Sequence, residues 1–266
     1  MINTWFDRVR RTLFTGSAFV LFFTGGLLLS YLILPLVHAW PGSADQPSRR
    51  SRLLVGRAWL LFHDYMRFAS ILRFDPRANR LDVPPGPFVL VANHPTLVDV
   101  TALIATLPDV AIVAKSEMFR SPLVGRLLRY CDHIRSDDGL FAGVAVVDAA
   151  LERLARGIPV LIFPEGTRSP LRGIGAVRPG AFEVAARAGV PVVVALIRCE
   201  PPTLMRGDPW YAIPERVPDL TVRQVFSIRV APGTAAEVAR RLQADLARMI
   251  ADPAAAEGSL TRRADA

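Results

Sequence analysis

The letters FVLVANHPTLVDV occupy residues 88–100 of this 266-residue chain. The apolar run Phe88–Ala92 predicts a buried β-strand. His94 stands just beyond its end, where open α/β sheets usually build their sites. Pro95 favours the first turn of a helix, because its fixed φ suits that position. We therefore expect Asp99 about one turn along that helix, with its carboxylate reaching back to His94.

The spacing of His94 and Asp99 suits general-base chemistry. A carboxylate on one ring nitrogen of His94 would keep that nitrogen protonated and leave the other free to take a proton from a substrate hydroxyl. Asp99 would also stabilise the imidazolium that forms. A structural interpretation stays open, in which His94 caps the helix and Asp99 is a favourable anion in its first turn.

A second motif, FPEGTRS at residues 163–169, begins at the last residue of the apolar run PVLIF. Its Pro/Gly turn would carry Glu165, Thr167 and Arg168 out of the sheet edge, where backbone amides and a guanidinium can grip a phosphate. Glu165 would bind a substrate hydroxyl or position Arg168, because two anions repel. A solvated loop with an incidental arginine is the alternative.

Outward from these motifs, apolar runs alternate with helical segments. Such alternation predicts an α/β fold with a mixed, largely buried sheet that is covered by helices. Further strands are expected at VAIVA from Val110, PVLIF at 159–163, PVVVALI at 191–197 and RQVFSIRVA at 223–231, and helices at 141–156, 181–188 and 234–252.

The N-terminal part contains an uncharged, mostly apolar run, Leu13–Val37, in a chain whose mean hydropathy is +0.30. At helical rise this run could cross a hydrocarbon core of roughly 30 Å. A signal peptide is the competing interpretation, because three arginines precede the run. Its apolar part is longer than the usual stretch of about 7–15 residues, which favours a retained anchor.

A second N-terminal stretch, Leu53–Phe74, has apolar residues at helical spacing that alternate with charged ones. It predicts an amphipathic helix that either lies in a membrane interface or faces the core. The chain then divides into an anchor (1–40), a linker with the amphipathic helix (41–76), the main α/β domain (77–252) and a disordered tail (253–266).

The formal net charge is +8. Basic residues beside a membrane segment are drawn to anionic headgroups, by about 1 kcal/mol each. The sequence lacks a recognisable nucleic-acid reader motif, so no nucleic-acid partner is expected. Cys131 and Cys199 have no C-x-x-C spacing, and no metal site is predicted. Lys115, the only lysine, is a candidate contact for a phosphate or an acyl carrier. Alternatively, it has no specific role and is present by chance in a chain that otherwise uses arginine.

Together, NHPTLVD and FPEGTRS, about seventy residues apart, resemble the glycerolipid and lysophospholipid acyltransferase family that includes lysophosphatidic acid acyltransferases. VAKSEMFRSPLVG at 113–125 and VRPGAFEVAARAGVPVVVA at 177–195 are similar to further blocks of that family. The likeness runs from about residue 88 to residue 195, and the apolar N-terminal segments suit its architecture.

The resemblance implies that His94 is the catalytic base, that Asp99 is its partner, and that Glu165, Gly166, Thr167 and Arg168 bind the acceptor. The implied reaction is O-acyl transfer from acyl-CoA or acyl-carrier protein to a lysophospholipid hydroxyl, above all that of 1-acyl-glycerol-3-phosphate. No cofactor or metal is required. The implied location is the cytoplasmic face of a bacterial inner membrane, with membrane lipids as partners.

Two segments depart from the family pattern. In HIRSDD at 133–138, Arg135 stands one position early; it is a candidate acceptor ligand or a surface partner of Asp137 or Asp138. CEPPTLMRGDPWYAIP at 199–214 is similar to a subset linked to bacterial aryl-polyene lipids, and it would form an acyl-binding or membrane-facing loop, or a packed surface loop. A glycolipid, aminolipid or aryl-polyene acceptor therefore stays open, as does a non-catalytic scaffold on anionic membranes.

Overall fold

A six-stranded mixed sheet forms the centre of the chain, in a computed structural model that describes residues 4–137, 142–171 and 173–252. The strand order is β3-β2-β4-β1-β5-β6, and each neighbouring pair is parallel except β5 and β6. The strands are β1 (Val89–Ala92), β2 (Ala111–Lys115), β3 (Ile134–Ser136), β4 (Val160–Ile162), β5 (Val192–Glu200) and β6 (Asp219–Ile228). The predicted α/β class with a mixed, buried sheet is confirmed. The predicted tail and Asp138 lie outside the described residues.

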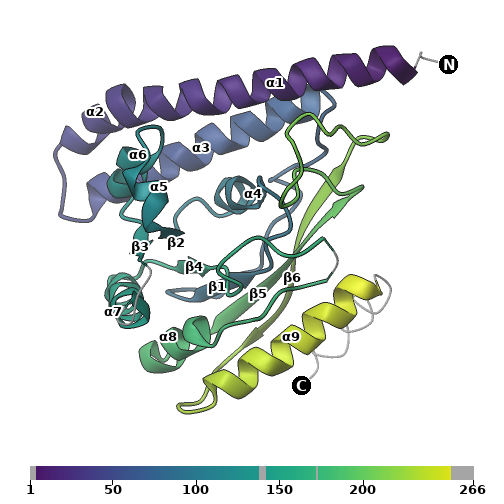
Figure 1. The fold of residues 1–266 in the computed structure, drawn as a ribbon. Coiled ribbons are helices and arrows are strands. Elements are labelled where there is room, and N and C mark those ends of the chain that lie inside the picture. Colours follow the sequence, from purple (N-terminus) through teal and green to yellow (C-terminus); the bar gives the residue numbers. More distant parts are fainter. Residues whose placement is uncertain (1–3, 138–141, 172, 253–266) are drawn as a thin grey trace.

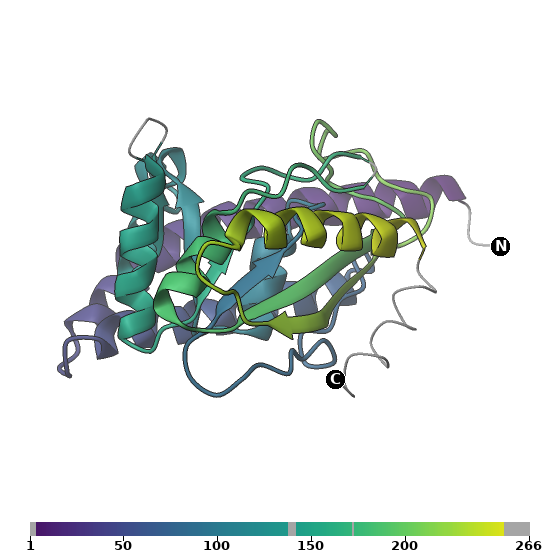
Figure 2. The same cartoon turned by 90° about the horizontal axis from the view of Figure 1, so that it is seen from below.

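Alternation along β1 explains why both faces of the sheet are covered (Figures 1 and 2). Val89 and Val91 pack into one core, with α7 (Ala142–Ala155), α8 (Gly180–Ala188) and α9 (Ala235–Ala251). Leu90 and Ala92 point the other way and pack against α3 (Gln46–Phe68) and α4 (Asp99–Thr106). A strand that is apolar on both sides is therefore buried between two helical layers.

α3 differs from its predicted bounds of 53–74 at both ends. It begins at Gln46, because Pro47 suits a first helical turn. It ends at Phe68, because Ser70 adopts a positive φ of 53° that a helix cannot continue through. One face of α3 packs closely on α4 and the turn after it: a Cβ at Gly56 would lie 3.3 Å from the Ile104 carbonyl oxygen and 2.2 Å from the side chain of Pro108. The other face leaves Leu61 exposed.

The apolar N-terminal segment is helical over 5–39 and consists of α1 (Thr4–Leu28), a π-helical turn η1 (Leu29–Ile33) and α2 (Leu34–Ala39). Among the described residues it is the one helix long and apolar enough to cross a membrane. Figure 1 shows it lying beside α3 instead of projecting from the domain. Ser17 Oγ lies 2.6 Å from the Tyr65 hydroxyl, and Ser30 Oγ donates to the Leu123 carbonyl at 3.0 Å.

Two short helices, α5 (Ser116–Arg120) and α6 (Gly125–Tyr130), follow β2 and complete the layer on the α3 side. They form a separate apolar cluster with α2 and α3, which contains Leu34, Val55, Leu127 and Leu128. This cluster and α1 enclose space above the carboxyl ends of β1, β2 and β4. A cavity therefore lies between the sheet and the N-terminal helices.

Candidate active site

His94 and Asp99 are in direct contact. His94 follows β1 after one residue, Asp99 is the first residue of α4, and Nδ1 of the imidazole lies 2.9 Å from Oδ2 of the carboxylate. Asp99 is fully buried, which raises the pKa of its carboxyl group. Hydrogen bonds from His94 and from the backbone and hydroxyl of Thr96 counteract this effect of burial.

The predicted helix start at Pro95 is wrong. Residues 95–98 form a turn, and α4 begins only at Asp99. The reason is that Thr96 donates to the Asp99 carboxylate through its N–H at 2.6 Å and its hydroxyl at 2.5 Å, which closes the turn before the helix can begin. The contact between His94 and Asp99 therefore comes from a side-chain-closed turn.

The FPEGTRS loop wraps around His94. The ring of Phe163 stacks on the imidazole, with 4.4 Å between ring centroids and 27° between ring planes. The backbone N–H of Ser169 donates to the His94 carbonyl at 2.7 Å. These contacts hold both the ring and the backbone of His94, which leaves its Nε2 at the surface of the adjoining cavity without a partner among the described residues.

Glu165 lies behind His94 and does not border the cavity. Its carboxylate accepts hydrogen bonds from the Ser169 hydroxyl at 2.6 Å, the Gly175 N–H at 2.6 Å and the His94 N–H at 3.2 Å. It is 4% exposed. These protein donors occupy both oxygens, so the contacts correspond to a positioning role for Glu165. Its role as an acceptor ligand stays a prediction.

Asn93, which precedes His94 in the NHPTLVD motif and had no predicted role, fixes the start of that motif to β5. Its side-chain amide donates to the Ile197 carbonyl at 2.9 Å and accepts from the Ile197 N–H at 2.7 Å. The amide thus continues the ladder between β1 and β5 beyond the last paired residues. The signal in the sequence was a polar residue directly after a fully apolar strand.

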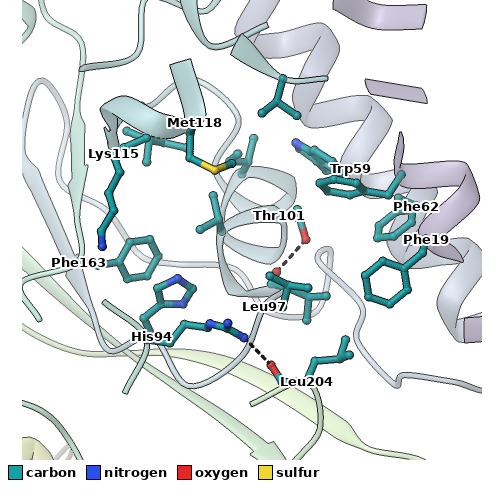
Figure 3. Close-up of a pocket in the computed structure, with 18 of the residues that line it drawn as sticks. Phe19, Trp59, Phe62, His94, Leu97, Thr101, Lys115, Met118, Phe163 and Leu204 are labelled. Carbon is teal, nitrogen blue, oxygen red and sulfur yellow. Dashed lines mark hydrogen bonds between the residues drawn. The ribbon is translucent and has the colours of Figure 1, made fainter. Parts of the chain in front are cut away.

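Four cations border the cavity, and three of them, Lys115, Arg168 and Arg178, lie on the side of His94. The fourth, Arg11, pairs with Asp7. Gly166 and Thr167 border it as well, and Gly166 has a φ of +67°, with Arg178 Nη1 3.5 Å from the position of a Cβ. Figure 3 shows the Lys115 ammonium on the same side of the cavity as His94 and Phe163. Arg178 was missed, although the block VRPGAFEV contains it.

The cations differ in how strongly the protein holds them. The Arg168 guanidinium donates to the carbonyls of Leu204 and Met205, each at 3.2 Å. For the Arg178 guanidinium and the Lys115 ammonium, the described part of the chain offers no hydrogen-bond acceptor or ion-pair partner. Arg135 is 61% exposed and pairs with Asp137 at 2.9 Å, outside the cavity. Of its two predicted roles, the structure contains the surface ion pair.

The cavity has a volume of about 800 Å³ and becomes apolar away from His94. Figure 3 shows Leu97, Phe19, Phe62 and Trp59 along the side opposite Lys115 and Phe163. The apolar wall comes from α1, α3 and α4 and from the predicted Pro-rich loop, which contributes Thr203, Leu204, Ile213 and Pro214. An extended hydrocarbon chain could lie in such a space while its polar end stays beside His94.

The Pro-rich loop is attached to α1. Arg11, 3% exposed, donates to the carbonyls of Pro214 at 2.7 Å and Glu215 at 2.8 Å. The indole of Trp210 packs edge-on against Phe19, with centroids 6.0 Å apart. Trp210 and Tyr211 nevertheless remain largely exposed beside the apolar outer face of α1. Part of the loop therefore closes the cavity and part of it faces outward.

Metal ligation has no candidate in the described ranges, where no group of three or more His, Cys, Asp or Glu side chains could hold an ion. Cys131 is buried, Cys199 is partly buried, and both are free thiols. Burial raises the pKa of each thiol to about 12. Neither cysteine is therefore a thiolate nucleophile near neutral pH.

Comparison with known proteins points to one family. Residues 78–198 match the family described as Acyltransferase. The chain is 29% identical over 197 residues to a 1-acyl-sn-glycerol-3-phosphate acyltransferase of Chlamydomonas reinhardtii, covering 72% of this chain and 55% of that protein. It is 33% identical over 173 residues to a chloroplastic enzyme of the same description from Arabidopsis thaliana, covering 63% and 47%. This chain thus spans about half the length of these curated relatives.

A solved structure has the same fold. It is the 1-acyl-sn-glycerophosphate (LPA) acyltransferase of Thermotoga maritima, with a TM-score of 0.59 and 19% sequence identity, over 92% of this chain and 98% of that one. At this identity the likeness concerns the fold alone.

Proposed function

We propose that this chain, which belongs to the acyltransferase family, transfers an acyl group from a thioester donor to the free hydroxyl of 1-acyl-glycerol-3-phosphate. One observation carries the proposal: the unpaired Nε2 of His94 lies where a cationic wall meets an apolar one. The cationic side suits a phosphate, and the apolar side suits an acyl chain.

His94 acts as the general base. The hydrogen bond to Asp99 keeps the proton on Nδ1, so Nε2 can accept the proton of the acceptor hydroxyl. The hydroxyl oxygen then attacks the thioester carbonyl, and a tetrahedral oxyanion forms. When it collapses, the carbon–sulfur bond breaks, and the proton on Nε2 passes to the departing thiolate. Buried Asp99 stabilises the imidazolium between these two steps.

Lys115, Arg168 and Arg178 would bind the acceptor phosphate. A phosphate monoester carries about −1.5 to −2 charges near pH 7, which three cations can neutralise. None of the three cations has an acidic partner in the described part of the chain, and Arg168 donates only to two backbone carbonyls. Binding a phosphate there breaks no existing ion pair, and it costs mainly the desolvation of the ions.

The long N-terminal helix would attach the enzyme to one leaflet. Contacts at Arg11, Ser17 and Ser30 join α1 and η1 to the domain along most of their length. Lipid can therefore surround only the outer side, where Leu13 and Leu36 are two-thirds exposed. A helix held in this way lies in the interface. Attachment at the cytoplasmic face of a bacterial inner membrane would give access to acyl-CoA or acyl-carrier protein.

The test is acyl transfer by purified protein in detergent, from radiolabelled acyl-CoA or acyl-carrier protein, to acceptors headed by lysophosphatidic acid. His94→Ala should abolish transfer. His38→Ala, which changes a histidine outside the cavity, should retain it. Transfer that survives His94→Ala would overturn the mechanism.

A non-phosphate acceptor is the second candidate. The observation that favours it is Arg135, whose ion pair with Asp137 keeps it out of the cavity. The acceptor panel therefore includes glycolipid, aminolipid and aryl-polyene hydroxyls. His94-dependent transfer to one of these, with none to lysophosphatidic acid, would replace the phosphate acceptor and leave the chemistry unchanged.

A further inference from the structure

The apolar end of the cavity contains an indole N–H that has no acceptor. Trp59 borders the cavity, and its Nε1 is buried with no hydrogen-bond partner in the described structure. The indole stacks on Phe22, with ring centroids 5.4 Å apart, which fixes the plane of the ring. Figure 3 shows the indole nitrogen on the side of the ring that faces Met118 across the cavity.

A second donor borders the same cavity. His133 is 6% exposed, and its Nδ1 accepts a hydrogen bond from the Ile112 N–H at 3.2 Å. Burial, helped by the nearby Arg52, lowers the pKa of His133 to about 3, so the ring is neutral. With Nδ1 as the acceptor, the proton of a neutral ring sits on Nε2. Nε2 has no acceptor among the described residues.

The two donors belong to one part of the wall. Trp59 packs against the apolar cluster that contains Leu127 and Leu128 of α6. The backbone N–H of His133 donates to the Leu128 carbonyl at 3.0 Å, which places His133 beside the same helix. Both leucines also border the cavity. Hydrocarbon of Leu127 and Leu128 therefore adjoins both rings, while the charge of Arg52 lies near His133.

Unpaired donors in such surroundings are unfavourable, and a saturated acyl chain would leave them unpaired. An oxygen on the chain would pair with them, and a keto oxygen has two lone pairs for two donors. A keto oxygen and a hydroxyl oxygen can each accept these hydrogen bonds. Trp59 lies across the cavity from His94 (Figure 3), and His133 is hydrogen-bonded to Ile112, three residues before Lys115 on β2. The oxygen would therefore belong partway along the chain and not at its reacting end.

We propose that the Trp59 and His133 end of the cavity is a subsite for a keto or hydroxyl oxygen partway along an acyl chain, bound through the Trp59 Nε1–H and the His133 Nε2–H. This inference rests on the proposed acyl transfer, because it specifies the class of chain. The same chemistry could come from the donor's acyl group or from the chain already on the acceptor.

The experiment compares stearoyl-CoA with a positional series of oxostearoyl-CoAs, using the full-length protein in detergent. The measured quantity is the ratio of kcat/KM for oxo and plain donors. For at least one oxygen position, Trp59→Phe should lower this ratio about tenfold, since the phenyl ring packs without donating. Trp210→Phe is the matched control and should leave the ratio unchanged, because Trp210 does not border the cavity.

His133→Asn is the second variant. The asparagine oxygen can still accept from the Ile112 N–H, so the fold is kept while the Nε2 donor is lost. The same ratio should fall again. A ratio that is equal in the wild type and in both variants, at every oxygen position, would overturn the subsite.

Two further experiments distinguish a subsite for the donor chain from a subsite for the acceptor chain, and both from the absence of a subsite. Plain stearoyl-CoA with an oxostearoyl lysophosphatidic acid assigns the subsite to the acceptor chain if Trp59→Phe raises only that acceptor's KM. Calorimetry measures the binding of oxostearate and of stearate without turnover. Trp59→Phe should weaken the binding of oxostearate and leave the binding of stearate unchanged. Normal His94-dependent transfer of stearate without any oxo effect would remove the subsite and leave the proposed function intact.

Discussion

The Glu165 carboxylate accepts a hydrogen bond from the backbone N–H of His94 at 3.2 Å, across 71 residues of sequence. The same oxygen accepts from the Ser169 hydroxyl, and the other oxygen accepts from the Gly175 N–H. One buried carboxylate therefore joins the two motif loops to a third segment. Its effect on acyl transfer would come through the position of His94.

Glu165→Gln should lower kcat more than it changes the KM for the acceptor. The amide oxygen can still accept from Ser169 and His94, whereas its NH₂ group cannot accept from the Gly175 N–H. We expect kcat to fall about 10- to 100-fold, the effect of losing a hydrogen bond to a charged group. Steady-state kinetics with varied lysophosphatidic acid measure this, with Glu183→Gln, an exposed glutamate on α8, as control. A large rise in KM at constant kcat would make Glu165 an acceptor ligand.

Asp99→Asn should reduce kcat less than Asp99→Leu does. Thr96 N–H donates to Oδ2, so an amide oxygen would stay there and keep the proton on Nδ1 of His94. Only the negative charge is lost, which we expect to cost about 10- to 100-fold. The leucine removes both the charge and the hydrogen bond and should approach the activity of His94→Ala. Single-turnover rates of acyl transfer would show which variant is more active. If both Asp99 variants are equally inactive, Thr96 does not orient the amide oxygen toward His94.

Arg178→Gln should raise the KM for lysophosphatidic acid about tenfold and leave transfer to the corresponding monoacylglycerol unchanged. The reason is that the Arg178 guanidinium borders the cavity and would lose a charge-assisted bond to the phosphate. Arg187→Gln alters a surface arginine that pairs with Asp148 and serves as control. If the KM values for both acceptors rise equally, Arg178 does not contact the phosphate.

Mild acid should destabilise the protein through two buried histidines. Burial lowers the pKa of His63 to about 4 and of His133 to about 3, against about 6.5 when unfolded. Between those values the unfolded chain binds more protons, so its population rises as pH falls. The free energy of unfolding should drop by about 1 kcal/mol for each histidine between pH 7 and pH 5.5.

Chemical denaturation in detergent at the two pH values measures this loss. His133→Asn removes one of the two titrating rings and should halve the loss. An unchanged pH dependence in that variant would show that His133 does not stay neutral in the folded protein.

Local patterns predicted the sheet and the contact between His94 and Asp99. The β1 strand follows from five apolar residues, and the contact of His94 with Asp99 needs only a turn of suitable length. The start of α4 was predicted four residues early, because the hydroxyl of Thr96 competes with helix formation. That competition depends on the Asp99 carboxylate being close, which no propensity for Pro95 describes.

The remaining features depend on contacts between distant segments. Glu165 faces inward because His94 and Gly175 bring backbone N–H groups to it. Arg178 reaches the cavity because its backbone N–H is held by the Pro164 carbonyl at 3.0 Å. The apolar wall combines residues of α1 and α3 with β2 and α6. Periodicity identifies each helix as apolar but not which side of it will border a cavity.

The contacts of α1 also bear on how the protein could evolve. Phe19 and Phe22 belong to the cavity wall, and Arg11 secures the loop that closes it. An unrelated apolar helix of equal length could hold the protein at a bilayer but would supply neither. Exchange of the first forty residues between relatives would therefore also replace part of the cavity wall and the contact that holds its closing loop.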